Sequence, residues 1–313
     1  MKFRRIIRHV LVGFLAVLIL AGTIFSIVWW YFHPHFTRTE KITYAQRKGR
    51  DLQFDVIQPA HPNGAGVVVM VSGRWKSSGS GMDPLILAPL LRRGYTLFTV
   101  AHGSQPEFTV MEIFADVQLA VRHIRHHAGE HGVDPRRLAV TGGSSGGHLR
   151  LMLATRGDSG RSDATDPVER ESSMLQAAAV FYPVTDLLNL GRSTENPGDG
   201  GPPKSFLKAF GPDSTNMPSW KVIGRDMSPI YHVSTNLPPV LILHGDADTL
   251  VPIEQSEWFV ERAHAAGRTI QLINRPGKKH GWLTMLWDTR LFADWFDRHL
   301  PPKSTINPGL KSN

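Results

Sequence analysis

The sequence predicts an α/β fold, with a mostly parallel central sheet, helices on both faces and one preceding N-terminal transmembrane helix. Short apolar runs alternate with amphipathic helical segments along most of the chain, which is typical of parallel sheets with right-handed crossovers. The run at residues 67–71 is apolar throughout, as expected of a strand buried on both faces. A long apolar stretch near the N-terminus predicts the transmembrane helix.

The composition is that of a globular protein. The chain has 313 residues, of which 41% are hydrophobic and 20% are charged, so it can bury a sizeable core. It contains no cysteine, which excludes disulfides, cysteine-ligated metals and a cysteine nucleophile. The net charge is +8, and half of this excess comes from basic residues at positions 2–8, beside the apolar stretch. Because the other basic residues are scattered, we expect no nucleic-acid partner.

The N-terminal segment has the features of a membrane anchor. No charged residue occurs at 10–32, a length of about 34 Å as a helix against a hydrocarbon core of ~30 Å. Aromatic residues at 29–32 would lie at the membrane interface, and the basic residues before the span would stay cytoplasmic. We therefore predict a signal anchor and connector over 1–36, with the remaining chain on the extracytoplasmic side. A long cleaved signal peptide and a buried helix are the alternatives.

The remaining chain predicts one domain over 37–302 and a disordered polar tail over 303–313. Residues 33–40 form a polar connector, and runs at 41–46 and 52–57 form an antiparallel edge pair. Further strands are expected at 67–71, 95–100, 137–140, 177–182, 240–243 and 269–273, and helices at 84–92, 110–124, 147–153, 253–266 and 285–299. Segments 156–173 and 191–229 are irregular. The second is expected to form a partial lid over the carboxyl ends of the strands.

The sharpest motif is GGSSGGH at residues 142–148, between a predicted strand and a predicted helix. G-x-S-x-G in this context is typical of a nucleophile elbow, in which a tight turn projects a serine hydroxyl above the sheet. The pattern fits two frames, centred on Ser144 and on Ser145, and the spacing alone does not choose between them. A serine hydroxyl is a weak nucleophile, so it needs a base that is held by an acid.

Candidate acids and a candidate base follow later strands. Asp246 and Asp248 come after the run at 240–243, and His280 comes after the strand near residue 272. Because the carboxyl ends of parallel strands meet at one edge of a sheet, these residues are expected to converge on the elbow. The oxyanion hole would use the amide of Ser145 and one amide from the loop at 71–75, for which Arg74 is the candidate.

Residues 40–300 resemble the α/β-hydrolase superfamily, most closely the esterase and dienelactone-hydrolase-like branches and the catalytic domains of prolyl oligopeptidases. The resemblance rests on the elbow, on HGDADTLVP at 244–252 and on the late HG that begins at His280. It implies Ser144 as the nucleophile, Asp248 as the acid and His280 as the base. The family's H-G-G-G-W oxyanion loop corresponds to residues 72–75, with Arg74 in place of a glycine.

The resemblance implies a serine esterase that cleaves carboxylic esters through an acyl-enzyme, with a small-molecule ester as substrate and no metal or organic cofactor. Trp75, Trp282 and Tyr182 neighbour the proposed catalytic elements and are candidates for the substrate pocket. The H-x-x-E-H pattern at 127–131 is not expected to bind zinc, because neighbouring glycines end the helix there. The alternatives are a prolyl-oligopeptidase-like peptidase, for which the usual N-terminal propeller is not expected here, and a non-catalytic binding protein. Oligomeric state is not predicted.

Overall fold

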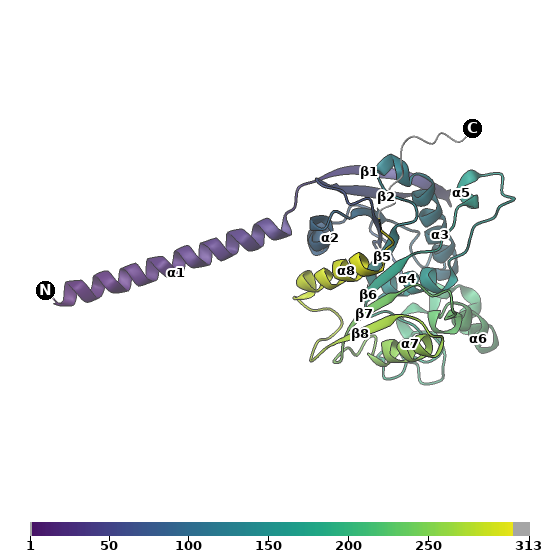
Figure 1. The fold of residues 1–313 in the computed structure, drawn as a ribbon. Helices are drawn as coiled ribbons and strands as arrows, with labels where there is room; N and C mark the ends of the chain where they lie inside the picture. The colour runs from purple at the N-terminus through teal and green to yellow at the C-terminus, as the bar shows by residue number, and fades with distance from the viewer. Residues whose placement is uncertain (1, 303–313) are drawn as a thin grey trace, which may run out of the picture.

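The computed structural model describes residues 2–302, whose central element is an eight-stranded sheet in the order β1-β2-β4-β3-β5-β6-β7-β8 (Figure 1). The strands are β1 (Phe36–Arg47), β2 (Arg50–Pro59), β3 (Gly66–Met70), β4 (Thr96–Val100), β5 (Leu138–Gly143), β6 (Ala177–Phe181), β7 (Val240–Gly245) and β8 (Ile270–Arg275). Strands β3 to β8 are parallel, and the hairpin of β1 and β2 joins them antiparallel through β4. The predicted mostly parallel sheet is confirmed, and the predicted tail at 303–313 lies outside the described residues.

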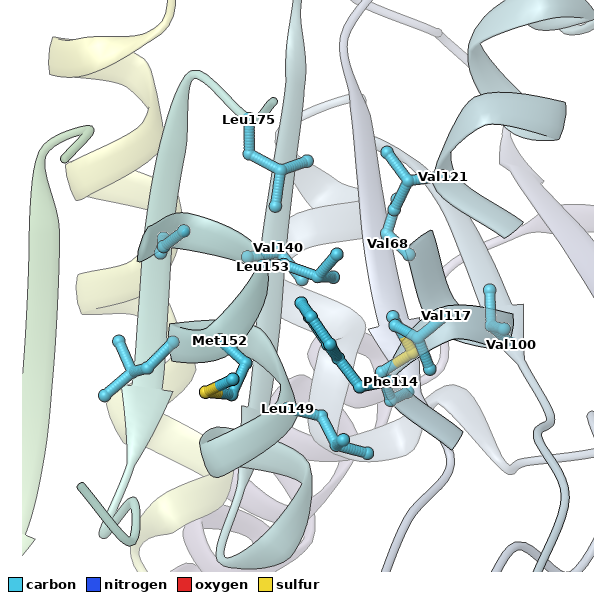
Figure 2. Close-up of a cluster of buried hydrophobic side chains, with 14 of the residues drawn as sticks. Val68, Val100, Phe114, Val117, Val121, Val140, Leu149, Met152, Leu153 and Leu175 are labelled. Carbon is cyan, nitrogen blue, oxygen red and sulfur yellow. The ribbon is translucent and has the colours of Figure 1, made fainter. Parts of the chain in front are cut away.

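Helices cover both faces of the sheet, as predicted. The helices of the described chain are α1 (Lys2–Phe32), which projects from the body (Figure 1), and α2 (Ala88–Arg92), α3 (Val110–His126), α4 (Ser145–Arg156), α5 (Pro167–Arg170), α6 (Met217–Asp226), α7 (Glu254–Ala265) and α8 (Met285–His299). Short 3₁₀ turns include η1 (Pro84–Leu87) and η3 (Lys204–Phe210). A hydrophobic core lies on each face of the sheet, and β3 contributes to both because its successive side chains point to opposite faces. Val68 faces the α3–α4 side, and Val67 faces the α2–α8 side. Figure 2 shows Phe114 of α3 and Leu153 of α4 packed near Val68 and Val140.

Several element boundaries differ from the prediction for local reasons. The helix expected at 84–92 is divided into η1 and α2, because Pro89 lacks the amide hydrogen that a continuous helix would need. Strand β1 begins at Phe36, so part of the expected connector is paired with β2. The irregular segment at 191–229 contains η3 and α6 as well as loops.

Helix α1 projects from the body of the protein, and only its C-terminal end packs against it (Figure 1). The stretch Phe3–Phe32 is long and apolar enough to cross a membrane, and within the described residues none of its apolar window is buried. The alternative of a buried helix is therefore wrong.

A buried carboxylate, Asp55 of β2, ties the edge hairpin to the loop that follows β3. Its oxygens accept hydrogen bonds from the Lys41 amide at 2.9 Å, the Ser80 hydroxyl at 2.6 Å and Nε of Arg38 at 3.0 Å. Because the residue is 1% exposed, these contacts replace the solvation of its carboxylate. The loop that begins at Ser72 is thereby fixed at its far end.

Replacing this carboxylate should destabilise the fold. We expect Asp55→Ala to lower the free energy of unfolding by about 3 kcal/mol, because Arg38 and the Lys41 amide lose a buried partner. Urea denaturation monitored by circular dichroism measures this. Asp51→Ala, at an exposed position on the same strand, should change it by less than about 0.5 kcal/mol. Equal effects of the two substitutions would contradict the role given to Asp55.

Candidate active site

Ser144 occupies a strained turn between β5 and α4. Its backbone has φ 55° and ψ −129°, a conformation that residues with a side chain adopt at a cost of about 1–3 kcal/mol. The Ser144 amide donates to the Phe181 carbonyl at 3.1 Å, and the Ser144 carbonyl accepts from the His148 amide at 2.9 Å. These hydrogen bonds on both sides hold the turn, so the hydroxyl is presented at the carboxyl end of the sheet.

The glycines on either side of Ser144 are required by a buried arginine. A Cβ on Gly142 would lie 2.3 Å from Cζ of Arg150, and one on Gly146 would lie 2.6 Å from Nη1 of the same residue. Arg150 is fully buried in α4, and its Nη1 donates to the Gly146 carbonyl. The positions of the glycines in the motif therefore follow from the packing of Arg150 against the turn as well as from the backbone conformation of the turn.

His280 brings the predicted residues of three loops together. Its Nε2 lies 3.0 Å from Oγ of Ser144, and its Nδ1 lies 2.7 Å from Oδ2 of Asp248. The loops follow β5, β7 and β8, whose carboxyl ends meet at one edge because the strands are parallel. Oγ of Ser145 lies instead 3.4 Å from Oγ of Ser72. The geometry thus favours the Ser144 frame.

Asp248 is held in its ionised form. Its Oδ1 accepts the amides of Leu250 at 2.9 Å and Val251 at 3.0 Å. Burial opposes ionisation, but hydrogen bonds from His244 and His280 and the charge of the latter outweigh it and hold the pKa of Asp248 well below its usual value. The Nε2 of His244 is closer to the Val251 carbonyl, at 2.8 Å, than to Asp248, at 3.5 Å. The main partner of the carboxylate is therefore His280.

Asp246, the other candidate acid, holds the loop that carries His280. Its Oδ1 accepts from the Gly277 amide at 2.6 Å, and its Oδ2 accepts from Nδ2 of Asn274 at 3.2 Å. Both aspartates therefore contribute to the position of the imidazole, one directly and the other through the backbone.

The predicted oxyanion loop is also strained. Arg74 and Trp75 have φ values of 56° and 54°, in the left-handed region that favours glycine. The Trp75 indole donates to Nδ1 of His148 at 3.1 Å, and Nε2 of His148 donates to the Met227 carbonyl at 2.7 Å. Burial lowers the pKa of His148 to about 4, so the ring stays neutral and accepts the indole hydrogen. This hydrogen bond fastens the loop to α4.

Two cavities meet at Ser144, and residues 74, 144 and 250 line both of them. Within residues 2–302, the amides of Arg74 and Ser145 have no hydrogen-bond partner, so both are free to donate. The smaller cavity has a volume of about 50 Å³, and its walls include Trp75, Val184, Leu190, Phe206 and Leu250. The larger has a volume of about 440 Å³, and its walls include Met82, Ile86, Tyr182, His280 and Met285. His280 lines only the larger of the two cavities.

The pocket candidates have different positions. The Tyr182 ring lies against the His280 ring, with centroids 4.4 Å apart, and burial together with the Asp248 charge raises its pKa to about 12. Trp75 lines the smaller cavity. Trp282 packs behind Tyr182 and donates from its indole to Oδ2 of Asp288 at 2.6 Å. Trp282 is in the lining of neither cavity, and its polar group is bound to α8.

Sequence reasoning missed most of the cavity walls. Val184 and Leu190 follow β6, and Phe206 lies in η3, in segments without helical or strand periodicity. The only signal in the sequence for a structural role of His148 was its position directly after the paired glycines of the elbow motif.

Comparisons with known proteins identify esterases as similar to this chain. The BD-FAE family profile matches residues 54–262. The chain is 30% identical to the probable carboxylic ester hydrolase LipM of Mycobacterium tuberculosis over 61% of this chain and 42% of LipM, and 29% identical to esterase LipQ of the same organism over 70% of this chain and 50% of LipQ. It thus spans about half the length of these curated relatives. The butyrate-bound structure of esterase Est2 from Thermogutta terrifontis superposes with a TM-score of 0.63 and 27% identity, over 85% of this chain and 96% of Est2.

The neutral state of His148 makes stability depend on pH. The folded-state pKa of about 4 lies below the unfolded value of 6.5, so the unfolded chain binds more protons between these values and stability falls as pH falls. The contribution is at most about 1.4 kcal/mol per pH unit. We expect His148→Gln, which cannot titrate, to show a shallower slope of unfolding free energy against pH than the unmodified chain. His61→Gln, at an exposed position, should keep that slope; an unchanged slope in His148→Gln would contradict the assignment.

Proposed function

The chain belongs to the BD-FAE family and has the α/β-hydrolase fold, and from this premise we propose that it is a serine hydrolase of carboxylic esters. The observation that carries the proposal is the His280 imidazole, hydrogen-bonded to Ser144 on one side and to Asp248 on the other. The relatives named as esterases support ester hydrolysis as the reaction type.

The proposed reaction proceeds in two halves. Oγ of Ser144 attacks the ester carbonyl carbon while Nε2 of His280 takes its proton, and Asp248 stabilises the resulting imidazolium. The free amides of Arg74 and Ser145 donate to the oxyanion. Collapse of the tetrahedral intermediate breaks the ester bond, and His280 returns the proton to the leaving alcohol. A water molecule, deprotonated by His280, then attacks the acyl-enzyme; the bond to Oγ of Ser144 breaks, His280 returns the proton to Oγ, and the acid is released.

In this proposal, the position of His280 indicates which part of the ester each cavity holds. The general acid must reach the leaving oxygen, so the alcohol lies on the side of His280, in the larger cavity. The acyl group then occupies the smaller cavity, whose volume of about 50 Å³ and apolar walls suit a short acyl chain. The butyrate-bound state of Est2 is in keeping with this size class.

Helix α1 is proposed as a signal anchor. Its apolar stretch is exposed along its length and ends in an aromatic group at residues 29–32. Basic residues precede the stretch, and such flanks stay cytoplasmic, so the domain that carries Ser144 would lie on the extracytoplasmic side.

Removal of the nucleophile tests the reaction directly. We expect Ser144→Ala to lower kcat/KM for p-nitrophenyl acetate by about 10⁴-fold and to abolish labelling by a fluorophosphonate probe, because Ser144 carries the hydroxyl that is hydrogen-bonded to Nε2 of His280. Ser145→Ala keeps its backbone amide and should lose less than about tenfold. A chain that loses activity through Ser145→Ala but not through Ser144→Ala would overturn the proposal, as would an unmodified chain that is never labelled.

Acyl-chain preference tests the assignment of the cavities. We expect the unmodified chain to prefer p-nitrophenyl acetate to the hexanoate, because the smaller cavity cannot hold a long chain. Leu190→Ala enlarges that cavity and should raise the hexanoate-to-acetate ratio of kcat/KM about tenfold. Met285→Ala, in the wall of the larger cavity, should leave the ratio unchanged. A change in the ratio through Met285→Ala alone would reverse the assignment.

A further inference from the structure

The end of α1 is fixed to two elements of the body. Arg92 of α2 donates from its guanidinium to the carbonyls of Trp30 and Tyr31, with Nε 3.1 Å from the Tyr31 oxygen, and so caps the last turn of the helix. The rings of Tyr31 and Phe32 pack on Trp287 of α8, with centroids 5.5 Å and 4.6 Å away. The direction in which α1 leaves the body is therefore set by specific contacts.

The turn η1, which directly precedes α2, and the helix α8 both contribute to the walls of the larger cavity. Ile86 and Leu87 belong to η1, which runs directly into α2, and Met285 belongs to the first turn of α8. The cavity thus lies next to the point where α1 meets the body. Figure 1 shows α2 and α8 on the side of the body from which α1 projects.

The loop at residues 277–283, which carries His280, lies at this side and exposes apolar and basic groups. Leu283 is 86% exposed, which is the highest exposure recorded for a large hydrophobic residue in the described chain. Lys278 and Lys279 are exposed in the same loop. Trp29 and Trp30, in the last turn of α1, are exposed by 56% and 60%. Exposed apolar side chains beside basic ones are typical of protein surfaces that rest on anionic lipid.

We propose that the loop at 277–283 contacts the lipid surface in which α1 is anchored, so that the larger cavity receives esters of lipophilic alcohols from the bilayer. The lipid surface is the occupant that these contacts favour, because the loop leads into the start of α8, on which the aromatic end of the anchor packs, and its lysines complement anionic headgroups. The apolar side chains in the wall of the larger cavity, which include Met82, Ile86 and Met285, suit such an alcohol. The inference rests on the proposed anchor and on the proposed ester hydrolysis.

Single-cysteine labelling tests the lipid contact without reference to catalysis. The chain has no cysteine, so Leu283→Cys and Val222→Cys each introduce one thiol for a nitrobenzoxadiazole fluorophore. Val222 is a matched control, 70% exposed on α6, at the opposite side of the body from α1 (Figure 1). In full-length chain reconstituted in phosphatidylcholine–phosphatidylglycerol vesicles, nitroxide-labelled lipid should quench the probe at 283 by about half and leave the probe at 222 unchanged. Equal quenching at both positions, or none at 283, would overturn the proposal.

Kinetics in the same vesicles test delivery of the substrate. We expect Leu283→Ser to lower the rate on membrane-embedded hexadecyl acetate about tenfold and to leave p-nitrophenyl acetate hydrolysis unchanged, whereas Val222→Ser should affect neither. An equal loss on both esters, or no loss on either, would overturn delivery from the bilayer. If the unmodified chain hydrolyses neither ester, the proposed ester hydrolysis fails while the quenching result still decides the contact; if the chain does not float with vesicles, the anchor fails.

Discussion

The pair of hydrogen bonds made by the His280 imidazole is the constraint on which the candidate site depends. A ring that bridges Ser144 and Asp248 tolerates little displacement, so the loops after β5, β7 and β8 must all be fixed relative to one another. Parallel pairing through β6 provides the coarse placement. The fine placement comes from local contacts: backbone amides on Asp248, and Asp246 on the backbone of the loop at 277–283.

Backbone strain in this protein is concentrated around the same site. Of the six non-glycine residues with positive φ in the described chain, four lie near the carboxyl ends of neighbouring strands: Arg74, Trp75, Ser144 and Tyr182. Each such conformation persists only where surrounding contacts enforce it. Here the Trp75–His148 hydrogen bond holds one turn, and the Phe181 carbonyl holds another. The packed body therefore supports a set of turns that present Ser144 and two free amides to a common space.

The attachment of α1 to the body relates the proposed active site to the membrane in which α1 is proposed to be anchored. The last turn of α1 is capped by Arg92 and packed on Trp287. Trp287 lies in α8, which forms part of the wall of the larger cavity, and Arg92 lies in α2, which follows the cavity-lining turn η1. An anchor fastened in this way limits how the body can turn above a membrane. A flexible linker in its place would leave the orientation of the cavity open.

The sequence by itself determined the class of fold and the small set of residues from which the site is built. Periodicity depends on neighbours along the chain, so strands, helices and the position of the elbow were predictable from it. The motif left two serines open and the acid loop left two aspartates open, and only the resemblance chose between them. The tertiary structure decided which of these side chains meet His280, why Arg150 requires the glycines, and that Trp282 is bound to Asp288 and lines neither cavity. These outcomes depend on contacts between residues far apart in the chain and on irregular loops, which leave no periodic pattern in the sequence.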